Sequence, residues 1–257
     1  MSFSGKTIVI AGGTSGIGMS LASRFTSLGN VVIILGRDDR KGKLTEAQLG
    51  KNSRFLQCDV SDHQAVERVF QEIDTEYSGF DLAVNNAGIT TPYSPVADVA
   101  AHDWEQNISI NLSGVFHCMK HQIPVLQRKP GGAIVNVSSC AGVVPLARQA
   151  PYVSSKAAVN ALTQVAALEY AFEGGNSHPV RINAIAPGPT LGGMNTAERL
   201  AANPANTEKK RNATAMRRFA EPKEIVEAVE WLLSERASYV TGTILNVDGG
   251  YAAGKLP

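Results

Sequence analysis

Two residues whose side chains could manage a proton, Tyr152 and Lys156, stand four positions apart. Four residues are about one helical turn, so both side chains would point to one face of a helix. A phenol normally titrates near pH ~10, and an ammonium group one turn away favours the phenolate and lowers the phenol pKa. A tyrosine tuned in this way could give or take a proton near neutral pH. Alone, the pair also fits an ordinary helix with a half-buried tyrosine and a solvated lysine, because short motifs match often.

A glycine-rich turn near the start of the chain has the pattern of a dinucleotide site. Gly12 permits a tight turn, Gly16 lets the backbone approach a pyrophosphate, and Gly18 lets a helix pack closely on a sheet. Backbone N–H groups at the helix start would bind the phosphates. The alternative is a glycine turn without a ligand, since the spacing is G-x-x-x-G-x-G and not G-x-G-x-x-G. The predicted contributors are Gly12, Thr14, Ser15, Gly16, Ile17 and Gly18.

The end of the second expected strand indicates which dinucleotide would bind. An acidic residue there would bond the adenosine 2′-hydroxyl, whereas an arginine suits a 2′-phosphate. Gly36 occupies the acidic position and Arg37 follows it, so NADP(H) is favoured and NAD(H) remains possible. Asp38 and Asp39 fit the start of the next helix better than a ribose contact.

Composition narrows the class of protein. The 257 residues are 44% hydrophobic and 18% charged, as in ordinary globular proteins. A net charge of +1 gives no electrostatic case for nucleic acid or an anionic membrane. The three cysteines, Cys58, Cys118 and Cys140, lie far apart, and the first residues lack the features of a signal peptide. We therefore expect a cytoplasmic protein without nucleic-acid or membrane partners.

Strand and helix patterns alternate along the chain. Apolar runs predict strands at 6–11, 31–35, 54–58, 82–85, 133–138, 180–186 and 243–247. Helical patterns cover 16–28, 38–49, 62–77, 103–126, 152–172 and 221–234. This order predicts an α/β fold: a doubly wound, parallel, seven-stranded sheet with helices on both faces (a Rossmann fold). We expect one domain over 1–257. The least regular stretch, 187–218, would be a substrate lid or a poorly ordered segment.

Across nearly its whole length the chain resembles the short-chain dehydrogenase/reductase family, in its compact single-domain type. It is similar to 3-oxoacyl-acyl-carrier-protein reductases within that family. Any one matching motif is modest evidence, but their order and spacing are specific. The matches are the glycine run 12–18, Asp59-Val60, Asn85 to Gly88, Asn111, Val135 to Ser139, Tyr152 with Lys156, Pro187-Gly188 and Val247 to Gly250.

The resemblance implies a catalytic role for four residues. Tyr152 would be the proton donor to a ketone or the base to an alcohol. Lys156 would lower the tyrosine pKa and hold the nicotinamide ribose, and Ser139 would polarise the substrate oxygen. Ser138 is the competing assignment, but the spacing to Tyr152 favours Ser139. Asn111 would hold a water that links Lys156 to solvent.

The resemblance also implies cofactor contacts beyond the glycine turn. Asp59 would bind the adenine amino group beside the Val60 backbone. Asn86, Ala87 and Gly88 would line the cofactor ribose, and Pro187 and Gly188 would pack on the nicotinamide. The family usually has a threonine where this chain has Gly192, and Thr190 could take its place with a shifted loop.

These features predict an oxidoreductase that transfers hydride between NADP(H) and a small carbonyl or secondary alcohol. A 3-oxoacyl thioester or small ketone is the leading substrate class. The first alternative is an NAD(H)-dependent dehydrogenase of a sugar, polyol or hydroxysteroid. A more remote one is a dinucleotide-sensing protein without catalysis. The resemblance further implies a homotetramer formed partly through two long helices.

Several other patterns have two interpretations. His117 and His121, four apart, could form a metal pair, but with no obvious third ligand a packed or interface helix face is favoured and no metal is expected. The basic clusters 209–211 and 217–218 could meet an anionic substrate or carrier, although solvated charges are favoured. The run 173–178 fits a surface loop. Apolar residues that could line a substrate pocket or belong to the core are Tyr93, Val143, Val144 and Leu146.

Overall fold

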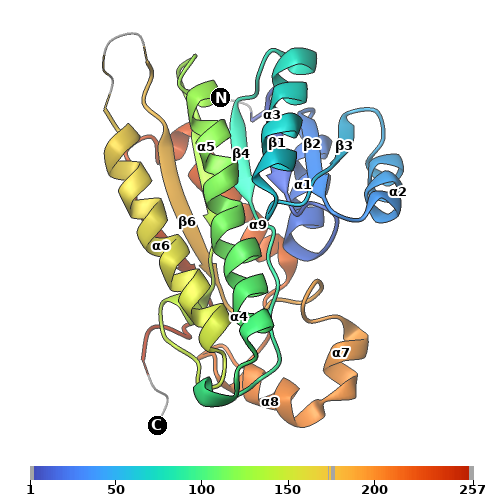
Figure 1. The fold of residues 1–257 in the computed structure, drawn as a ribbon, viewed down its shortest axis with the longest axis vertical. Helices are drawn as coiled ribbons and strands as arrows, with labels where there is room; N and C mark the ends of the chain where they lie inside the picture. The colour runs from blue at the N-terminus through green and yellow to red at the C-terminus, as the bar shows by residue number, and fades with distance from the viewer. Residues whose placement is uncertain (1–2, 173, 175–176, 255–257) are drawn as a thin grey trace.

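The computed structural model describes residues 3–172, 174 and 177–254 (Figure 1). Its seven strands are all parallel and form one sheet in the order β3-β2-β1-β4-β5-β6-β7. The strands are β1 (Thr7–Ala11), β2 (Val31–Gly36), β3 (Ser53–Gln57), β4 (Leu82–Asn85), β5 (Ala133–Val137), β6 (Arg181–Pro187) and β7 (Ile244–Val247). The order reverses direction between β1 and β4, so the predicted doubly wound parallel sheet is confirmed.

Helices cover both faces of this sheet, as Figure 1 shows. On one face lie α3 (His63–Tyr77), α4 (Ala101–Ile108), α5 (Gly114–Leu126) and α6 (Ala150–Tyr170). On the other lie α1 (Gly16–Ser27) and α9 (Pro222–Leu233), while α2 (Asp39–Leu49) packs beside β3. No helix in the described part of the chain is long and apolar enough to span a bilayer.

The strands sit between two hydrophobic cores because alternate side chains point to opposite faces. In β1, Val9 joins the core beneath α3, α5 and α6, whereas Ile8 and Ile10 join the core beneath α1 and α9. All three side chains are fully buried. Continuous apolar strands of this kind belong to parallel sheets covered on both faces, which is why the sequence pattern predicts the layers correctly.

The helical region expected at 103–126 is interrupted. A π-helical turn, Ser109–Ser113, lies between α4 and α5. Such a turn inserts one extra residue into the helical ladder and redirects the side chains that it carries. Asn111 lies in this turn and is fully buried, so the interruption positions a predicted site residue.

The stretch after β6 is more regular than expected. It contains two short helices, α7 (Ala197–Ala202) and α8 (Pro204–Asn212). Thr196 caps α7 by accepting a hydrogen bond from the Arg199 backbone, and Asn203 caps α8 in the same way. A parallel bridge between Thr190 and Ala220 joins the two ends of the stretch. We call residues 189–220 the α7–α8 segment. The run 173–178, expected to be a surface loop, lies partly outside the described residues.

Candidate active site and cofactor cavity

Two adjoining cavities lie at the carboxyl ends of the parallel strands. The larger has a volume of about 480 Å³ and the smaller about 190 Å³. Ser15, Asn86, Gly88 and Ile89 line both, so the cavities meet at the glycine turn. A crevice outside the strand ends, next to the reversal of strand order, is where open α/β sheets bind nucleotides. Two connected chambers that meet at a phosphate-type turn fit an elongated dinucleotide.

The glycine turn is held in a shape that only glycine permits. Gly12 has a φ of +78°, and a Cβ on it would lie 2.6 Å from Ala87 Cα. A Cβ on Gly18 would overlap Gly12 O. The Asn86 side chain locks the turn, because its Nδ2 donates a hydrogen bond to Gly12 O at 2.8 Å. All predicted turn residues except Gly18 line a cavity. Gly18, which was predicted to let the helix pack closely on the sheet, makes its close contact with the turn at Gly12 O and with Asn86 Nδ2.

The predicted catalytic residues converge on the larger cavity. Ser138 and Ser139 follow directly after β5, and Tyr152 and Lys156 lie on the first turns of α6. All four line the cavity. The Lys156 Nζ lies 5.9 Å from the centroid of the Tyr152 ring and donates a hydrogen bond to Val137 O at 2.8 Å. The helix therefore places the pair on one face, as the four-residue spacing predicts.

The predicted lowering of the Tyr152 pKa is not what the structure shows. Burial raises the pKa of the Tyr152 phenol to about 12, and hydrogen bonding to the Ser139 side chain opposes that rise. Burial also lowers the pKa of Lys156 to about 8. The expectation was wrong because the ammonium points to Val137 O, while loss of water contact disfavours the charged form of both groups.

The two serines at the end of β5 have different environments. The Ser138 hydroxyl donates a hydrogen bond to Lys156 O at 3.1 Å, which ties it to the backbone of α6. The Ser139 Oγ accepts a hydrogen bond from Ala141 N at 3.2 Å and also interacts with Tyr152. The bond from Ala141 N uses only an oxygen lone pair, so the Ser139 hydroxyl proton is directed to the cavity side, where its partner is Tyr152 or a substrate oxygen. This geometry favours Ser139 over Ser138 as the group that faces a substrate oxygen.

Asn111 forms a buried polar junction behind the catalytic pair. Its Oδ1 accepts a hydrogen bond from Ile89 N at 2.8 Å, and its Nδ2 donates to Ile89 O, to Asn107 Oδ1 and to Ser155 Oγ. A Cβ built on Gly88 would lie 3.2 Å from Asn111 Oδ1 and 3.4 Å from Lys156 Nζ. Asn111 thus fixes the wall of the cavity beside Lys156. Its predicted role in holding a water stays a prediction.

The smaller cavity is lined by some of the residues predicted to bind the adenosine half. Arg37 lines it together with Thr14, Gly36 and Val60. The Asp59 Oδ1 accepts hydrogen bonds from the Ser61 backbone and hydroxyl. Asp59 itself is not among the residues that line the cavity, although its neighbours Cys58 and Val60 are, so its contact with the adenine amino group stays a prediction.

Neither aspartate that follows Arg37 is directed to a ribose. Asp38 caps α2, where its Oδ1 accepts a hydrogen bond from Lys41 N at 2.9 Å. Asp39 forms an ion pair with Lys43 at 2.7 Å, one turn along the helix. Their predicted assignment to the helix start is confirmed.

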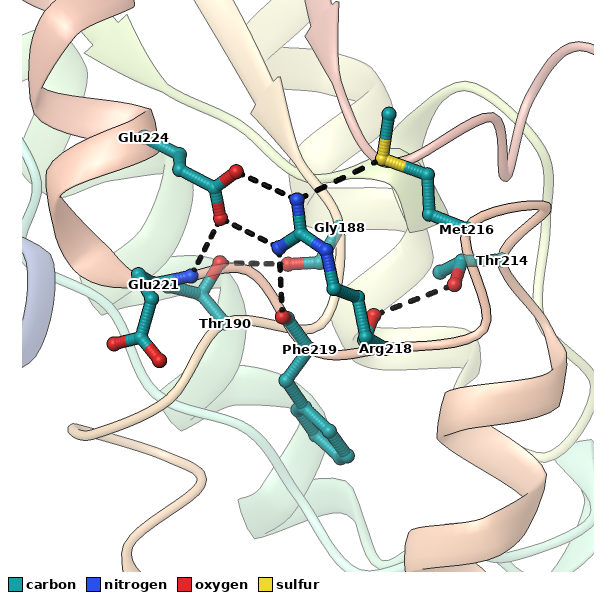
Figure 2. Close-up of polar contacts among 8 residues, drawn as sticks. All are labelled: Gly188, Thr190, Thr214, Met216, Arg218, Phe219, Glu221 and Glu224. Atoms are coloured by element: carbon teal, nitrogen blue, oxygen red, sulfur yellow. Dashed lines mark hydrogen bonds and ion pairs between the residues drawn. The ribbon is translucent and has the colours of Figure 1, made fainter.

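The end of β6 and the start of the α7–α8 segment form the side of the larger cavity that is predicted to contact the nicotinamide. Pro187, Gly188 and Thr190 line it, and the Thr190 hydroxyl donates a hydrogen bond to Gly188 O at 3.0 Å (Figure 2). Gly192, which stands where the family has threonine, has a φ of +79° and also lines the cavity. The Thr190 oxygen retains its acceptor capacity for a carboxamide donor.

An ion pair anchors the far end of the same segment. Both Arg218 guanidinium Nη atoms lie 2.7 Å from the Glu224 carboxylate oxygens (Figure 2). Glu224 also accepts a hydrogen bond from Glu221 N, completing the cap of α9, and Arg218 Nη1 donates to Phe219 O. Arg218 is exposed, in agreement with its interpretation as a solvated charge, and it also forms a bidentate contact with Glu224 of α9.

Two cations that no motif singles out also line the larger cavity: Lys41 from α2 and Arg199 from α7. The basic pair Arg40-Lys41, which follows Arg37 after two aspartates, is the sequence signal for the first. The second depends on how α7 packs over the cavity, which no local pattern encodes. Ile89, Thr90, Met194 and Asn195 are further lining residues without a sequence signal.

The patterns with two interpretations also have defined surroundings. The apolar group formed by Tyr93, Val143, Val144 and Leu146 is 38–45% exposed, so these side chains are not core residues. The His117 Nδ1 lies 2.9 Å from Val60 O, and His121 stacks on Phe70. Within the described part of the chain, no group of three or more His, Cys, Asp or Glu side chains could hold a metal ion.

A parallel sheet with a glycine turn and a Tyr–Lys pair at its carboxyl edge defines a nicotinamide-dependent oxidoreductase. A family model described as enoyl-(acyl carrier protein) reductase matches residues 11–252. A 2,5-dichloro-2,5-cyclohexadiene-1,4-diol dehydrogenase of Sphingobium indicum is 37% identical, covering 97% of this chain and 98% of the relative. A 3beta-hydroxysteroid dehydrogenase of Eggerthella lenta is 38% identical, covering 96% and 93%. The aldohexose dehydrogenase structure from Thermoplasma acidophilum has a TM-score of 0.85 at 31% identity, covering 99% and 97%.

The chain belongs to the short-chain dehydrogenase/reductase family. It is an enzyme that acts on CH–OH or C=O groups, in a family that uses NAD(P).

Proposed function

We propose that this enzyme transfers hydride between NADP(H) and a ketone or secondary alcohol, with Tyr152 as the proton donor or acceptor. The observation that carries the proposal is the convergence of Ser139, Tyr152 and Lys156 on one cavity that continues into the glycine turn. A cofactor placed on that turn would bring its nicotinamide end to these three side chains.

The residues of the chain would each perform one task. The bound nicotinamide supplies or accepts the hydride. As negative charge develops on a carbonyl oxygen, the Ser139 hydroxyl donates a hydrogen bond to it and Tyr152 gives it a proton. The raised pKa of Tyr152 keeps the phenol protonated at neutral pH, which suits the reduction direction. Lys156, beside the ring, stabilises negative charge on the phenol oxygen whenever its ammonium is protonated.

The preference for NADP(H) is supported at the adenosine end. Arg37 lines the smaller cavity, and Lys41 lines the adjoining larger one. Asp38 and Asp39, the nearby acids, are occupied in the first turn of α2. Positive charge without a directed carboxylate favours a 2′-phosphate over a free 2′-hydroxyl. Arg37→Asp should weaken NADPH binding by about 10-fold or more, and unchanged NADPH affinity would contradict this preference.

For the substrate we propose a ring-bearing secondary alcohol or its ketone. Tyr93, Val143, Val144 and Leu146 are half-exposed apolar residues. They are not among the residues that line the larger cavity, but Tyr93 lies close enough to Tyr152 to raise its pKa, which supports an apolar surface for a ring beside the catalytic tyrosine. Relatives carry names for acting on a cyclohexadiene diol, a 3β-hydroxysteroid and cis-4-hydroxycyclohexanecarboxylate. The 3-oxoacyl thioester, small ketones, and an NAD(H)-linked sugar or polyol remain the competing classes.

A substrate panel with both cofactors tests these assignments. The purified enzyme is offered cyclohexanols, 3β-hydroxysteroids, 3-oxoacyl thioesters and polyols, and the absorbance of reduced nicotinamide is followed. Tyr152→Phe should lower turnover by roughly 10²–10⁴-fold while cofactor binding is kept. Full turnover by Tyr152→Phe would overturn the mechanism. Cofactor binding without turnover on any substrate would instead support a dinucleotide-sensing role.

We also propose a homotetramer in the cytoplasm. Large apolar side chains are exposed on the outer side of α4, α5 and α6, where Leu168 is 83% and Phe116 is 49% exposed. Exposed patches of this kind mark interfaces. The three cysteines are free, as in proteins of reducing compartments. Light scattering after gel filtration should show four chains for the wild type and fewer for Leu168→Glu; a wild-type monomer would contradict the assembly.

A further inference from the structure

The first turn of the α7–α8 segment lies directly on the glycine turn. Gly192 and Asn195 exchange backbone hydrogen bonds of 3.0 and 2.8 Å, which close a tight turn around Gly193. Gly193 has a φ of +52°, and a Cβ built on Gly16 would lie only 3.0 Å from Gly193 Cα. The backbone of the segment therefore approaches the place where phosphate groups would bind.

A chain of side-chain hydrogen bonds holds this turn in place. Lys210 on α8 donates through Nζ to Asn195 Oδ1 at 2.7 Å, and Asn195 Nδ2 donates to Thr190 O at 2.8 Å. Lys210 is partly buried, and both its burial and the charge of Arg199 lower its pKa. The earlier interpretation of Lys210 as a solvated charge is thus wrong, and its neighbour in space is a second cation.

Arg199 brings an uncompensated positive charge to the larger cavity. Arg199 is exposed, is one of the residues that line that cavity, and takes part in none of the ion pairs among the described residues. The adjacent Glu198 interacts with Thr196 at the helix start instead of with Arg199. Lys41, on α2, lines the same cavity and likewise has no ion-pair partner among the described residues.

Two cations from separate elements, α2 and α7, therefore border a cavity whose floor is the phosphate-type turn. Arg199 is exposed and Lys210 is half-buried, so solvent screens their repulsion in part, and an anion near both would relieve the rest. The anion could belong to a substrate or to the cofactor. A substrate must bind at the end of the cavity that holds Ser139 and Tyr152. The contact between Gly193 and Gly16 instead places the start of the α7–α8 segment over the glycine turn. The position thus favours the phosphates of the cofactor.

We propose that Arg199 is a cofactor-binding residue of the α7–α8 segment, which contacts the phosphate groups of the dinucleotide from the side opposite the glycine turn. The segment would then close on the cofactor itself and act as a lid over it. This inference rests on the proposed function, because it requires that a dinucleotide binds in these cavities.

Binding of cofactor fragments tests the role of Arg199. Dissociation constants for NADPH, ADP-ribose and adenosine are measured by calorimetry on the wild type, Arg199→Gln and Arg199→Lys. Lys209→Gln is the matched control, since Lys209 lies on the same segment, is exposed and lines no described cavity. Loss of one charge-assisted bond should weaken ADP-ribose binding by about 10-fold in Arg199→Gln and less in Arg199→Lys.

Adenosine carries no phosphate, so its affinity should be the same in all four proteins. The loss for ADP-ribose should shrink at high salt, because screening weakens the wild-type contact. Equal ADP-ribose affinity in the wild type and Arg199→Gln refutes the inference but leaves the proposed function intact. A raised substrate KM with unchanged ADP-ribose affinity also refutes it, and assigns Arg199 to the substrate. A wild type that binds neither NADPH nor ADP-ribose refutes the proposed function as well.

Discussion

Replacing Lys156 with methionine should make the stability of the enzyme less dependent on pH. The Lys156 side chain is 97% buried, with a residue exposure of 3%, and burial lowers its pKa from 10.5 to about 8. Since one pKa unit is worth ~1.4 kcal/mol, the buried ammonium opposes folding by roughly 3 kcal/mol. This penalty is complete below the folded-state pKa. It is relieved as the pH rises from about 8 to 10.5, because there the unfolded chain binds more protons than the folded one.

The assay is urea unfolding at about pH 7.5 and about pH 9.5, where the linkage relation predicts a relief of about 2 kcal/mol. Both values lie below the region from 10 to about 12 in which the raised pKa of Tyr152 makes stability fall with pH. At each pH, the free energy of unfolding of Lys156→Met is subtracted from that of the wild type. This difference should be about 2 kcal/mol higher at pH 9.5 than at pH 7.5. Lys209→Met, at an exposed lysine, should show no such change relative to the wild type. If the difference in unfolding free energy between the wild type and Lys156→Met is the same at both pH values, the reasoning is refuted.

Three further outcomes follow from the geometry of the site. Ser139→Ala should lower kcat by about 10²-fold or more, as for loss of an oxyanion donor. Ser138→Ala should mainly lower thermal stability. Equal losses of kcat in the two variants would contradict the assignment of Ser139. Arg218→Met removes the bidentate contact with Glu224 at an exposed position. Its melting temperature should be slightly lower than that of Glu224→Gln, which keeps one hydrogen bond, and an equal or higher value would contradict this role of the ion pair. Gly12→Ala, at a φ of +78° and against backbone, should abolish cofactor binding in calorimetry; wild-type affinity there would show that the turn is not needed.

Local sequence patterns were sufficient to predict the architecture and many of the residues of the candidate site. Continuous apolar strands predict a sheet covered on both faces, and the glycine run predicts the phosphate-type turn because each glycine meets backbone there. The spacing of Tyr152 and Lys156 places both on one face of α6, since helical periodicity is a local property. Asp38 was assignable to a helix cap for the same reason.

Properties that depend on contacts between distant segments were decided only by the tertiary structure. The pKa of Tyr152 is raised and not lowered, because burial at the strand ends outweighs a neighbouring charge that is directed to Val137 O. The environment of Lys210 depends on Asn195, and the place of Arg199 depends on how α7 packs over the glycine turn. Solvation and long-range packing set these features, and neither is encoded in the residues next to them. The sequence by itself thus determined the fold and the candidate reacting groups, and the tertiary structure decided the protonation of those groups and which cations line the larger cavity.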